Sequence, residues 1–339
     1  MRNRRRELSR NDDSRLGIRF GYRSGVAFDR DQLKTNLARL AGQGVFVGTS
    51  SWKYPGWRGL LYDEARYVWR GRFAESRFEQ NCLAEYAEVF KTVCVDGAYY
   101  KFPDRRYLEG LMRQVPEDFL FAFKVTDEIT IKRFPNLPRF GWRAGQPNVN
   151  FLNAGLFTSG FLASCEPFRA HVGLLIFEFS RFHPEDFARG RDFVAALDEF
   201  LAQLPPGWPC GVEIRNPRFL HPDYFAMLAR HGATHVYNNW SGMPTVGEQM
   251  ALPGSRTNPQ LAGARFLLKP GRKYQEAVDQ FSPYDRLQEP LPEARAAAAE
   301  LIRRGSADGQ PKRTFVYVNN RLEGNALLTI DAVVEQAAQ

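Results

Sequence analysis

The chain has 339 residues, of which 44% are apolar, and carries a formal net charge of +8 at pH 7. This composition can fill the core of one large domain or two small ones, and no apolar run approaches the roughly 20 residues that cross a bilayer. Four widely spaced cysteines without a CxxC pair exclude a disulfide framework and favour a reducing, cytoplasmic location.

The positive charge is concentrated at the N-terminus. Residues 1–23 contain eight arginines against Glu7, Asp12 and Asp13, so this arm holds five of the eight excess positive charges. We predict a basic, disordered arm that can attract RNA, DNA or anionic surfaces by counterion release. A solvated tail without function is the more usual meaning of so polar a segment. Residues 24–44 are predicted to lead into the first strand.

Eight short apolar runs form the body of the chain, each ending in a polar or charged residue and each followed by a stretch that can form a helix. They are residues 45–48, 92–96, 119–124, 172–178, 210–215, 233–238, 265–269 and 314–320. This alternation predicts a parallel sheet, and eight such units predict a single (β/α)8 TIM barrel over residues 45–335. The carboxyl ends of the strands then form its functional face.

The connections between the strands differ greatly in length. Residues 48–57 form a loop rich in Trp, Tyr, Gly and Pro that is expected to cover the barrel mouth. The longest connection, residues 125–171, follows the third strand and contains Pro135, Pro138 and Pro147 and then an expected helix at 151–168. Loops of this length are usually functional lids or insertions. Other helices are expected at 77–90, 107–115, 187–204, 222–230, 289–304 and 325–335.

Period-two alternation sorts the residues at the strand ends into inward and outward positions. In residues 119–124 the three phenylalanines share the outer face, so Lys124 is expected to point into the barrel mouth. Glu213 and Arg215 share an inward face by the same argument, and Glu178 also lies inward. Other residues expected to complete this ring are Asp96, Asn238, Lys269 and one of Asn319 or Asn320. Buried charges need partners, and these positions supply both signs.

The inward charged residues are candidates for catalysis. Glu213 and Glu178 are candidate general acid and base groups, because two carboxylates in different surroundings can hold different pKa values. Lys124 is a candidate Schiff-base former or electrophile. Arg215 is a candidate group for gripping a carboxylate or phosphate. The alternative is a set of internal ion pairs that only stabilises the barrel.

The remaining candidate substrate-binding residues lie at the same strand ends and in the loops that follow them. They are Asp96, Trp52, Tyr100, Asn239, Trp240, Lys269 and Asn320. Their aromatic members can stack on a base or a sugar, or can simply pack loops over the mouth. The five histidines do not converge on a ligand set, and the phosphate-binding, dinucleotide-binding and serine-hydrolase loop motifs are missing. We therefore predict neither a metal nor a cofactor.

Several motifs occur in a fixed order along the body of the chain. They are Val45-Phe46-Val47-Gly48-Thr49-Ser50-Ser51-Trp52, Tyr99-Tyr100-Lys101-Phe102-Pro103, Phe121-Ala122-Phe123-Lys124, Val212-Glu213-Ile214-Arg215-Asn216-Pro217 and Val318-Asn319-Asn320. In this order they resemble the YecE-like family, and the resemblance covers nearly all of residues 45–335. It implies a TIM barrel but no settled activity.

The chain departs from the pattern of that family at positions that could carry chemistry. The Val-Glu-Ile-Asn-Ser-Thr-Phe-Tyr run of the family appears here as Val93-Cys94-Val95-Asp96-Gly97-Ala98-Tyr99-Tyr100. Its Ile-Thr-His ends here in Ile131, and its Glu-Val-Arg-His-Pro has Asn216 at the His. One Glu and two His are thereby missing from the mouth. A family-wide acid/base or metal mechanism is therefore not implied, and the chain resembles a divergent member.

Three functional hypotheses follow. The first is an enzyme with metal-independent acid/base chemistry, acting on a small anionic or phosphorylated substrate at the C-terminal face of the barrel. The second is a nucleic-acid-binding or nucleic-acid-processing protein that uses residues 1–23 and the aromatic rim, with steep salt dependence. The third is a non-catalytic binding or scaffold barrel, which is favoured if every inward carboxylate is locked in ion pairs. No membrane partner is expected, and the oligomeric state is left open.

Overall fold

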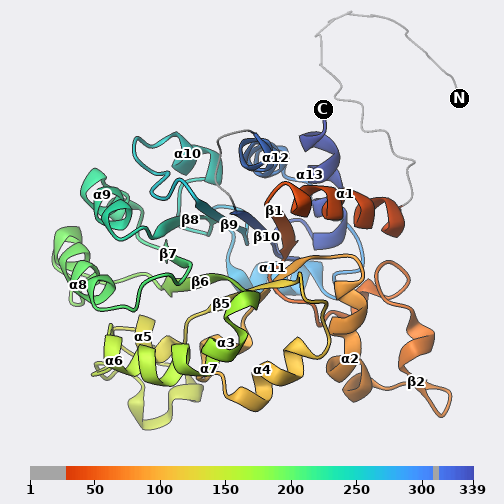
Figure 1. Ribbon diagram of the computed structural model, residues 1–339, viewed down its shortest axis with the longest axis horizontal. Coiled ribbons are helices and arrows are strands. Elements are labelled where there is room, and N and C mark those ends of the chain that lie inside the picture. Colours follow the sequence, from red (N-terminus) through yellow and green to blue (C-terminus); the bar gives the residue numbers. More distant parts are fainter. Residues whose placement is uncertain (1–27, 308–312) are drawn as a thin grey trace, which may run out of the picture.

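Eight parallel strands close into a barrel in the computed structural model, which describes residues 28–307 and 313–339 (Figure 1). The strands are β1 (Val45–Thr49), β4 (Thr92–Val95), β5 (Leu120–Lys124), β6 (Val172–Phe179), β7 (Cys210–Ile214), β8 (Thr234–Asn239), β9 (Leu261–Phe266) and β10 (Arg313–Val318). Each pairs with the next along the chain, and β10 closes on β1. The predicted TIM barrel is confirmed, while the predicted basic arm at 1–23 lies outside the described residues.

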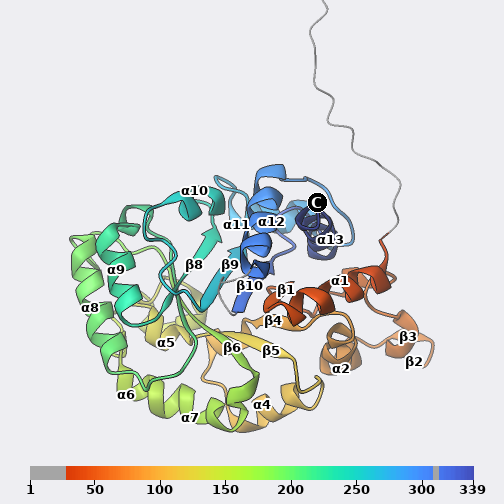
Figure 2. The ribbon, with the colours of Figure 1, turned by 45° about the horizontal axis from the view of Figure 1, so that its top comes forward.

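Helices surround the barrel (Figure 2). They are α1 (Arg30–Gly42), α2 (Glu75–Ala87), α4 (Arg105–Met112), α8 (Gly190–Ala202), α9 (Pro222–Arg230), α10 (Val246–Ala251), α11 (Tyr274–Phe281), α12 (Pro292–Ser306) and α13 (Ala326–Ala337). The sequence analysis did not assign α1, although Asp29 caps it and Leu33, Leu37 and Leu40 form its buried stripe. Within the described ranges, no helix has the length and apolar content needed to cross a membrane.

The predicted long insertion follows β5, the third strand of the barrel. It contains α5 (Asp127–Thr130), a 3₁₀ helix (Pro138–Arg143), α6 (Ala154–Leu156), a π-helical turn (Phe157–Leu162), α7 (Ala163–Cys165) and a second 3₁₀ segment (Glu166–His171). The single helix expected at 151–168 is therefore a series of short pieces. The short elements outside the insertion include α3 (Gly97–Tyr100) after β4 and three 3₁₀ helices (Pro55–Trp57, Glu64–Tyr67 and Pro217–Phe219). The hairpin of β2 (Val68–Trp69) and β3 (Arg72–Phe73) lies at the edge of the molecule (Figure 1).

Inward and outward residues form two separate apolar layers, as the alternation predicts. Ala122 and Ile176 belong to the cluster inside the barrel, whereas Phe121, Phe123 and Phe177 pack between the strands and the helices. Because Lys124 lies two residues after Ala122, and Glu178 two residues after Ile176, both continue the inner face. The inner layer therefore places these charged side chains at the mouth.

The seventh barrel strand, β9, lies about four residues earlier than predicted. The sequence analysis placed it at 265–269, but the chain extends from Leu261 to Phe266. Its Ala-Gly-Ala centre lacks the β-branched and aromatic residues that mark strands, and the apolar pair Leu267 and Leu268 instead packs with Phe281. Arg265 therefore takes the inward position that was assigned to Lys269.

The seam between β1 and β4 depends on Gly48. A Cβ atom there would overlap the backbone carbonyl oxygen of Thr92, which cannot rotate away. We expect Gly48→Ala to lower the free energy of unfolding by about 1–3 kcal/mol, measured by urea denaturation. Gly110→Ala in α4 is the matched control: a Cβ there meets nothing within 4 Å, and the change should stabilise the helix by up to about 1 kcal/mol. Equal stability of Gly48→Ala and the wild type would contradict the tight seam.

Candidate functional site

Six charged side chains meet at the carboxyl ends of the barrel strands. We call them the charge network, and they are Asp96 after β4, Lys124 on β5, Glu178 on β6, Glu213 on β7, Arg215 directly after β7 and Arg265 on β9. Three are cations and three are carboxylates. The structure brings together the three predicted catalytic residues, which are Lys124, Glu178 and Glu213. The predicted substrate-binding residues Asp96 and Arg215 lie in the same cluster.

Glu213 is the most deeply buried member of the charge network, with no exposed surface. Its Oε1 accepts a hydrogen bond of 2.8 Å from Arg215 Nε, and its Oε2 accepts one of 2.7 Å from Arg265 Nη1. Glu178 and Glu213 are direct neighbours in the register of β6 and β7. Both oxygens of Glu213 are therefore already bound by guanidinium groups, and no face of this carboxylate is open to a substrate.

Glu178 is the centre of the charge network. Its Oε2 lies 2.5 Å from Arg265 Nη1, 3.1 Å from Arg215 Nη2 and 3.1 Å from Lys124 Nζ. Burial alone would raise the pKa of this carboxyl, but the three cations outweigh it and hold the pKa well below its usual range. Glu178 therefore stays ionised near neutral pH and is a poor proton donor.

Lys124 is held as an ammonium. Burial alone would lower its pKa, but Glu178 and Asp96 outweigh it, and the pKa is raised above its usual value. Its Nζ also lies 4.0 Å from the ring centre of Tyr99, within cation–π range. A nucleophilic lysine needs a free amine. These surroundings therefore argue against Lys124 as a Schiff-base former.

The charge network is balanced and mostly covered. Its most exposed side chain is Asp96, at 36%, and the ring of Trp240 lies 3.9 Å from the Arg215 guanidinium. An anion that entered here would have to displace a carboxylate from its cations. The arrangement matches the alternative stated from the sequence, in which the inward charges form internal ion pairs.

Two of the predicted pocket residues instead anchor helices. Asn239 is buried, and its side-chain oxygen accepts a hydrogen bond from the backbone N–H of Val246 at the start of α10. The side-chain oxygen of Asn320 accepts from Trp57 Nε1 at 3.2 Å and from the backbone N–H of Ala326, the first residue of α13, at 2.7 Å. Through these contacts both residues attach a helix to the end of a strand.

The last three predicted residues lie apart from the charge network. Lys269 is partly exposed and pairs with Glu289 at 2.7 Å, beyond the end of β9. Trp52 is almost completely buried, so it packs the loop that follows β1. Tyr100 is exposed and lines a groove on the insertion side.

Arg265 is the member of the charge network that the sequence analysis missed. Its guanidinium contacts Asp96, Glu178 and Glu213, so it binds every carboxylate of the set. The signal that could have found it is the alternation of Leu261, Gly263 and Arg265 on one face of β9. Small residues on the other face hid that pattern.

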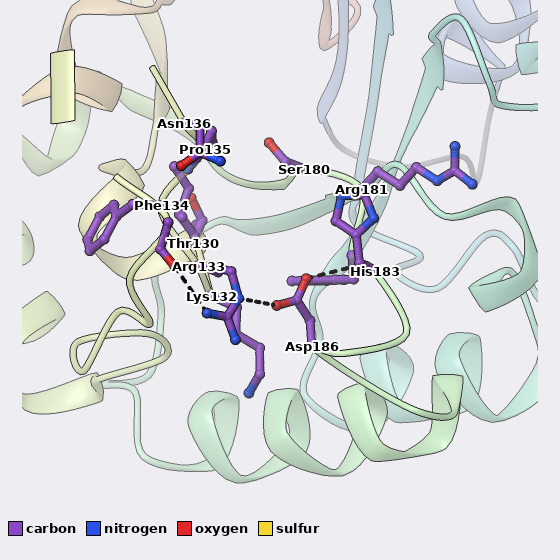
Figure 3. Close-up of a pocket in the computed structure, with 13 residues that line it drawn as sticks. Thr130, Lys132, Arg133, Phe134, Pro135, Asn136, Ser180, Arg181, His183 and Asp186 are labelled. Carbon is purple, nitrogen blue, oxygen red and sulfur yellow. Dashed lines mark hydrogen bonds and ion pairs between the residues drawn. The ribbon is translucent and has the colours of Figure 1, made fainter. Parts of the chain in front are cut away.

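A cavity of about 320 Å³ lies between the loops that follow β5 and β6 (Figure 3). Its lining includes Thr130, Lys132, Arg133, Asn136, Ser180, Arg181, His183 and Asp186. Arg133 Nε lies 3.7 Å from Asp186 Oδ1, and Arg133 Nη1 donates to the carbonyl of Gly145 at 3.1 Å. These contacts fix the guanidinium of Arg133 at the cavity wall.

The charge network and the cavity are connected through the chain. Lys124 ends β5 and Glu178 lies next to the last residue of β6, and their 3.1 Å ion pair holds these two strand ends together. The segments that directly follow them form the walls of the cavity. In the part of the chain that the structure describes, no three His, Cys, Asp or Glu side chains gather as metal ligands.

Removing one carboxylate from the charge network should unbalance it. We expect Glu178→Gln to lower the free energy of unfolding at pH 7 by about 3–5 kcal/mol, because three buried cations then face two carboxylates. Glu300→Gln is the control: its partially exposed ion pairs with Arg303 and Arg304 should contribute less than about 1 kcal/mol. Urea denaturation measures both, and equal losses would contradict the role of the network.

The low pKa of Glu178 also sets the direction of a pH effect. Its carboxyl has a lower pKa folded than unfolded, so the stabilisation is complete above about pH 4.5 and is lost as the pH falls toward the folded value. In Glu178→Gln, stability should depend less steeply on pH below 4.5, by up to about 1.4 kcal/mol per pH unit. Melting temperatures between about pH 6 and pH 3 test this, and parallel profiles would contradict it.

Two solved structures share the barrel over nearly their whole length. A DUF72 family protein from Enterococcus faecalis matches with a TM-score of 0.60 and 19% identity, covering 87% of this chain and 96% of that one. A DUF72 family protein from Thermotoga maritima matches with a TM-score of 0.56 and 21% identity, covering 87% of this chain and 99% of that one. At such identities the likeness shows the fold alone. No match was found among the curated proteins.

The family match covers the whole barrel. The family described as "Protein of unknown function DUF72" matches residues 46–339. The predicted membership in a barrel family without an assigned activity is thereby confirmed, while the YecE-like name stays a prediction. The chain belongs to the DUF72 family.

Proposed function

We propose that this barrel binds a small anionic or phosphorylated ligand in the cavity between the loops after β5 and β6. The observation that carries the proposal is the unbalanced charge of the lining: Lys132, Arg133 and Arg181 are cationic, and Asp186 is the one carboxylate among the lining residues. The volume of about 320 Å³ lies at the lower end of the range for small-molecule pockets, about 300–1,000 Å³.

Arg181 and Arg133 are the groups best suited to hold the anion. Guanidinium groups bind phosphate and carboxylate with paired hydrogen bonds. Arg133 is already oriented by Asp186 and Gly145, whereas Arg181 has no carboxylate partner among the residues that the structure describes. Arg181 lies on the opposite wall from Asn136, and its side chain extends away from the other lining residues (Figure 3), so it has to rotate to contact a bound ligand.

Lys132 contributes charge but has a different position. Its Nζ lies 4.2 Å from the ring centre of Phe187 and 5.1 Å from that of Phe151. These rings hold the ammonium away from direct contact with a ligand. It adds to the positive potential of the cavity without acting as a ligand-binding group.

The proposal gives the predicted catalytic carboxylates a positioning role. A general acid or base has to reach the reacting atom, and Glu213 has no exposed surface. Glu178 and Lys124 position the cavity walls through their ion pair. If the ligand is a substrate, His183 is the histidine in the cavity lining that could contact it. The second candidate is a barrel that binds without catalysis, and the balanced charge network favours it.

Substitution of the cavity arginines tests the proposal. We expect inorganic phosphate and phosphosugars to raise the melting temperature of the wild type, and Arg181→Gln and Arg133→Gln each to weaken binding about tenfold or more, since a charged hydrogen bond contributes about 1.5–3 kcal/mol. Calorimetric titration measures these affinities. Arg191→Gln, an exposed arginine on α8, is the matched control and should bind like the wild type. Equal binding by all four proteins, or binding by none, would reject the cavity as an anion site.

A further inference from the structure

A second concave surface lies on the other side of the insertion that follows β5. It is a groove of about 570 Å³, whose lining includes Tyr100, Lys101, Phe102, Arg139 and Arg143. None of its lining residues is shared with the anion cavity. We call it the insertion groove, and an inference about it does not depend on the proposed function.

Two large aromatic side chains beside the insertion groove are exposed to solvent. Trp142 is 87% exposed and Tyr100 is 63% exposed. Trp142 lies on the 3₁₀ segment Pro138–Arg143, directly after Gly141, whose φ of +52° is a conformation that favours glycine. This local backbone turn leaves the indole without a packing partner of its own size. Exposed aromatic groups of this kind usually mark a binding surface.

Three cations line the groove, namely Lys101, Arg139 and Arg143, together with the carboxylates of Asp127 and Glu128. The Arg139 guanidinium lies 5.1 Å from the ring centre of Tyr100 and 4.0 Å from that of Phe140. Arg139 also pairs with Asp127 at 2.7 Å, and Arg143 pairs with Glu128. In both pairs the carboxylate is the more buried partner and the arginine is about one-third exposed. The groove therefore presents positive charge to solvent.

The local sequence adds to this asymmetry. Residues 131–144 contain four cations and no acidic residue; Arg139 and Arg143 line the groove, whereas Lys132 and Arg133 line the anion cavity. Across the groove, Lys101 is strongly exposed. Rows of cations beside exposed rings are the pattern that binds a flexible polyanion whose units carry flat groups.

We propose that the insertion groove binds single-stranded nucleic acid, with bases stacked on Trp142 and Tyr100 and phosphates held by Lys101 and by the solvent-exposed sides of Arg139 and Arg143, which keep their ion pairs with Asp127 and Glu128. Protruding rings can stack on unpaired bases but not on bases that are paired inside a duplex. Every base has a π face, so binding of this kind tolerates many sequences.

The same observations favour a nucleic acid over a protein partner. The central part of a protein interface is usually depleted of charged residues. Here the exposed apolar side chains Leu137 and Trp142 alternate along the chain with Arg139 and Arg143. Such interleaving matches a strand that carries one phosphate for each base.

The experiment uses the full-length chain and fluorescence anisotropy with labelled single-stranded DNA and RNA oligonucleotides about 12 nucleotides long, beside a duplex of the same sequence. We expect both single strands to bind more tightly than the duplex, and Trp142→Ala to weaken their binding about tenfold. Trp69→Ala is the matched control, because Trp69 on the β2–β3 hairpin is 60% exposed and has Arg70 and Arg77 within cation–π range. It should bind like the wild type.

Salt dependence gives a second readout. Each lost phosphate contact should reduce the slope of log affinity against log salt by about 0.7 for single strands, so Lys101→Gln should show a slope shallower by that amount. Arg181→Gln, which alters the separate anion cavity, should bind oligonucleotides normally. This comparison distinguishes failure of the groove from failure of the proposed function.

Three outcomes would overturn the proposal. One is wild-type affinity in Trp142→Ala, which would assign any binding to another part of the chain, such as the basic residues 1–23. Another is a preference for the duplex. The third is the absence of oligonucleotide binding at low salt, which would favour a protein as the partner of the groove.

Discussion

The complete burial of Glu213 is the constraint on which the barrel mouth depends. A carboxylate without water needs full compensation, and Arg215 and Arg265 provide it with one guanidinium on each oxygen. Those two cations would be in excess without Glu178, and Glu178 in turn is balanced by Lys124. The strand ends of β5, β6, β7 and β9 are thus joined by electrostatics directly above the apolar layer inside the barrel.

Because the charges of the network pair with one another, they stabilise the barrel and are not free to bind a ligand. Charged strand ends in a TIM barrel suggest catalysis, because that face carries the active sites of such enzymes. Here the strand-end charges neutralise one another, and the unbalanced cations lie farther out, in the loops after β5 and β6 and in the insertion. In both proposals the barrel is the support, and the proposed binding surfaces are formed by loops outside the charge network.

The sequence predicts those segments in which inward and outward residues alternate at a regular spacing. Alternation correctly placed Lys124, Glu178, Glu213 and Arg215 inside the barrel, because a strand offers only two faces. It failed at β9, where Ala and Gly residues carry no strand signal. The exposure of Trp142 and the walls of the anion cavity could not be predicted, because they depend on the path of a proline-containing loop that has no period. Asn239 and Asn320 accept hydrogen bonds at the starts of α10 and α13, a contact that the alternation of a strand does not reveal.

The contacts of Arg265 also bear on how the protein is made. Arg265 is separated by 52 positions from Glu213 and by 87 from Glu178, and Trp57 bonds to Asn320 across 263 positions. A nascent chain on the ribosome exposes its carboxylates before Arg265 has been synthesised, and it cannot close the barrel until the last strand emerges. Native closure therefore waits until β10 has been synthesised.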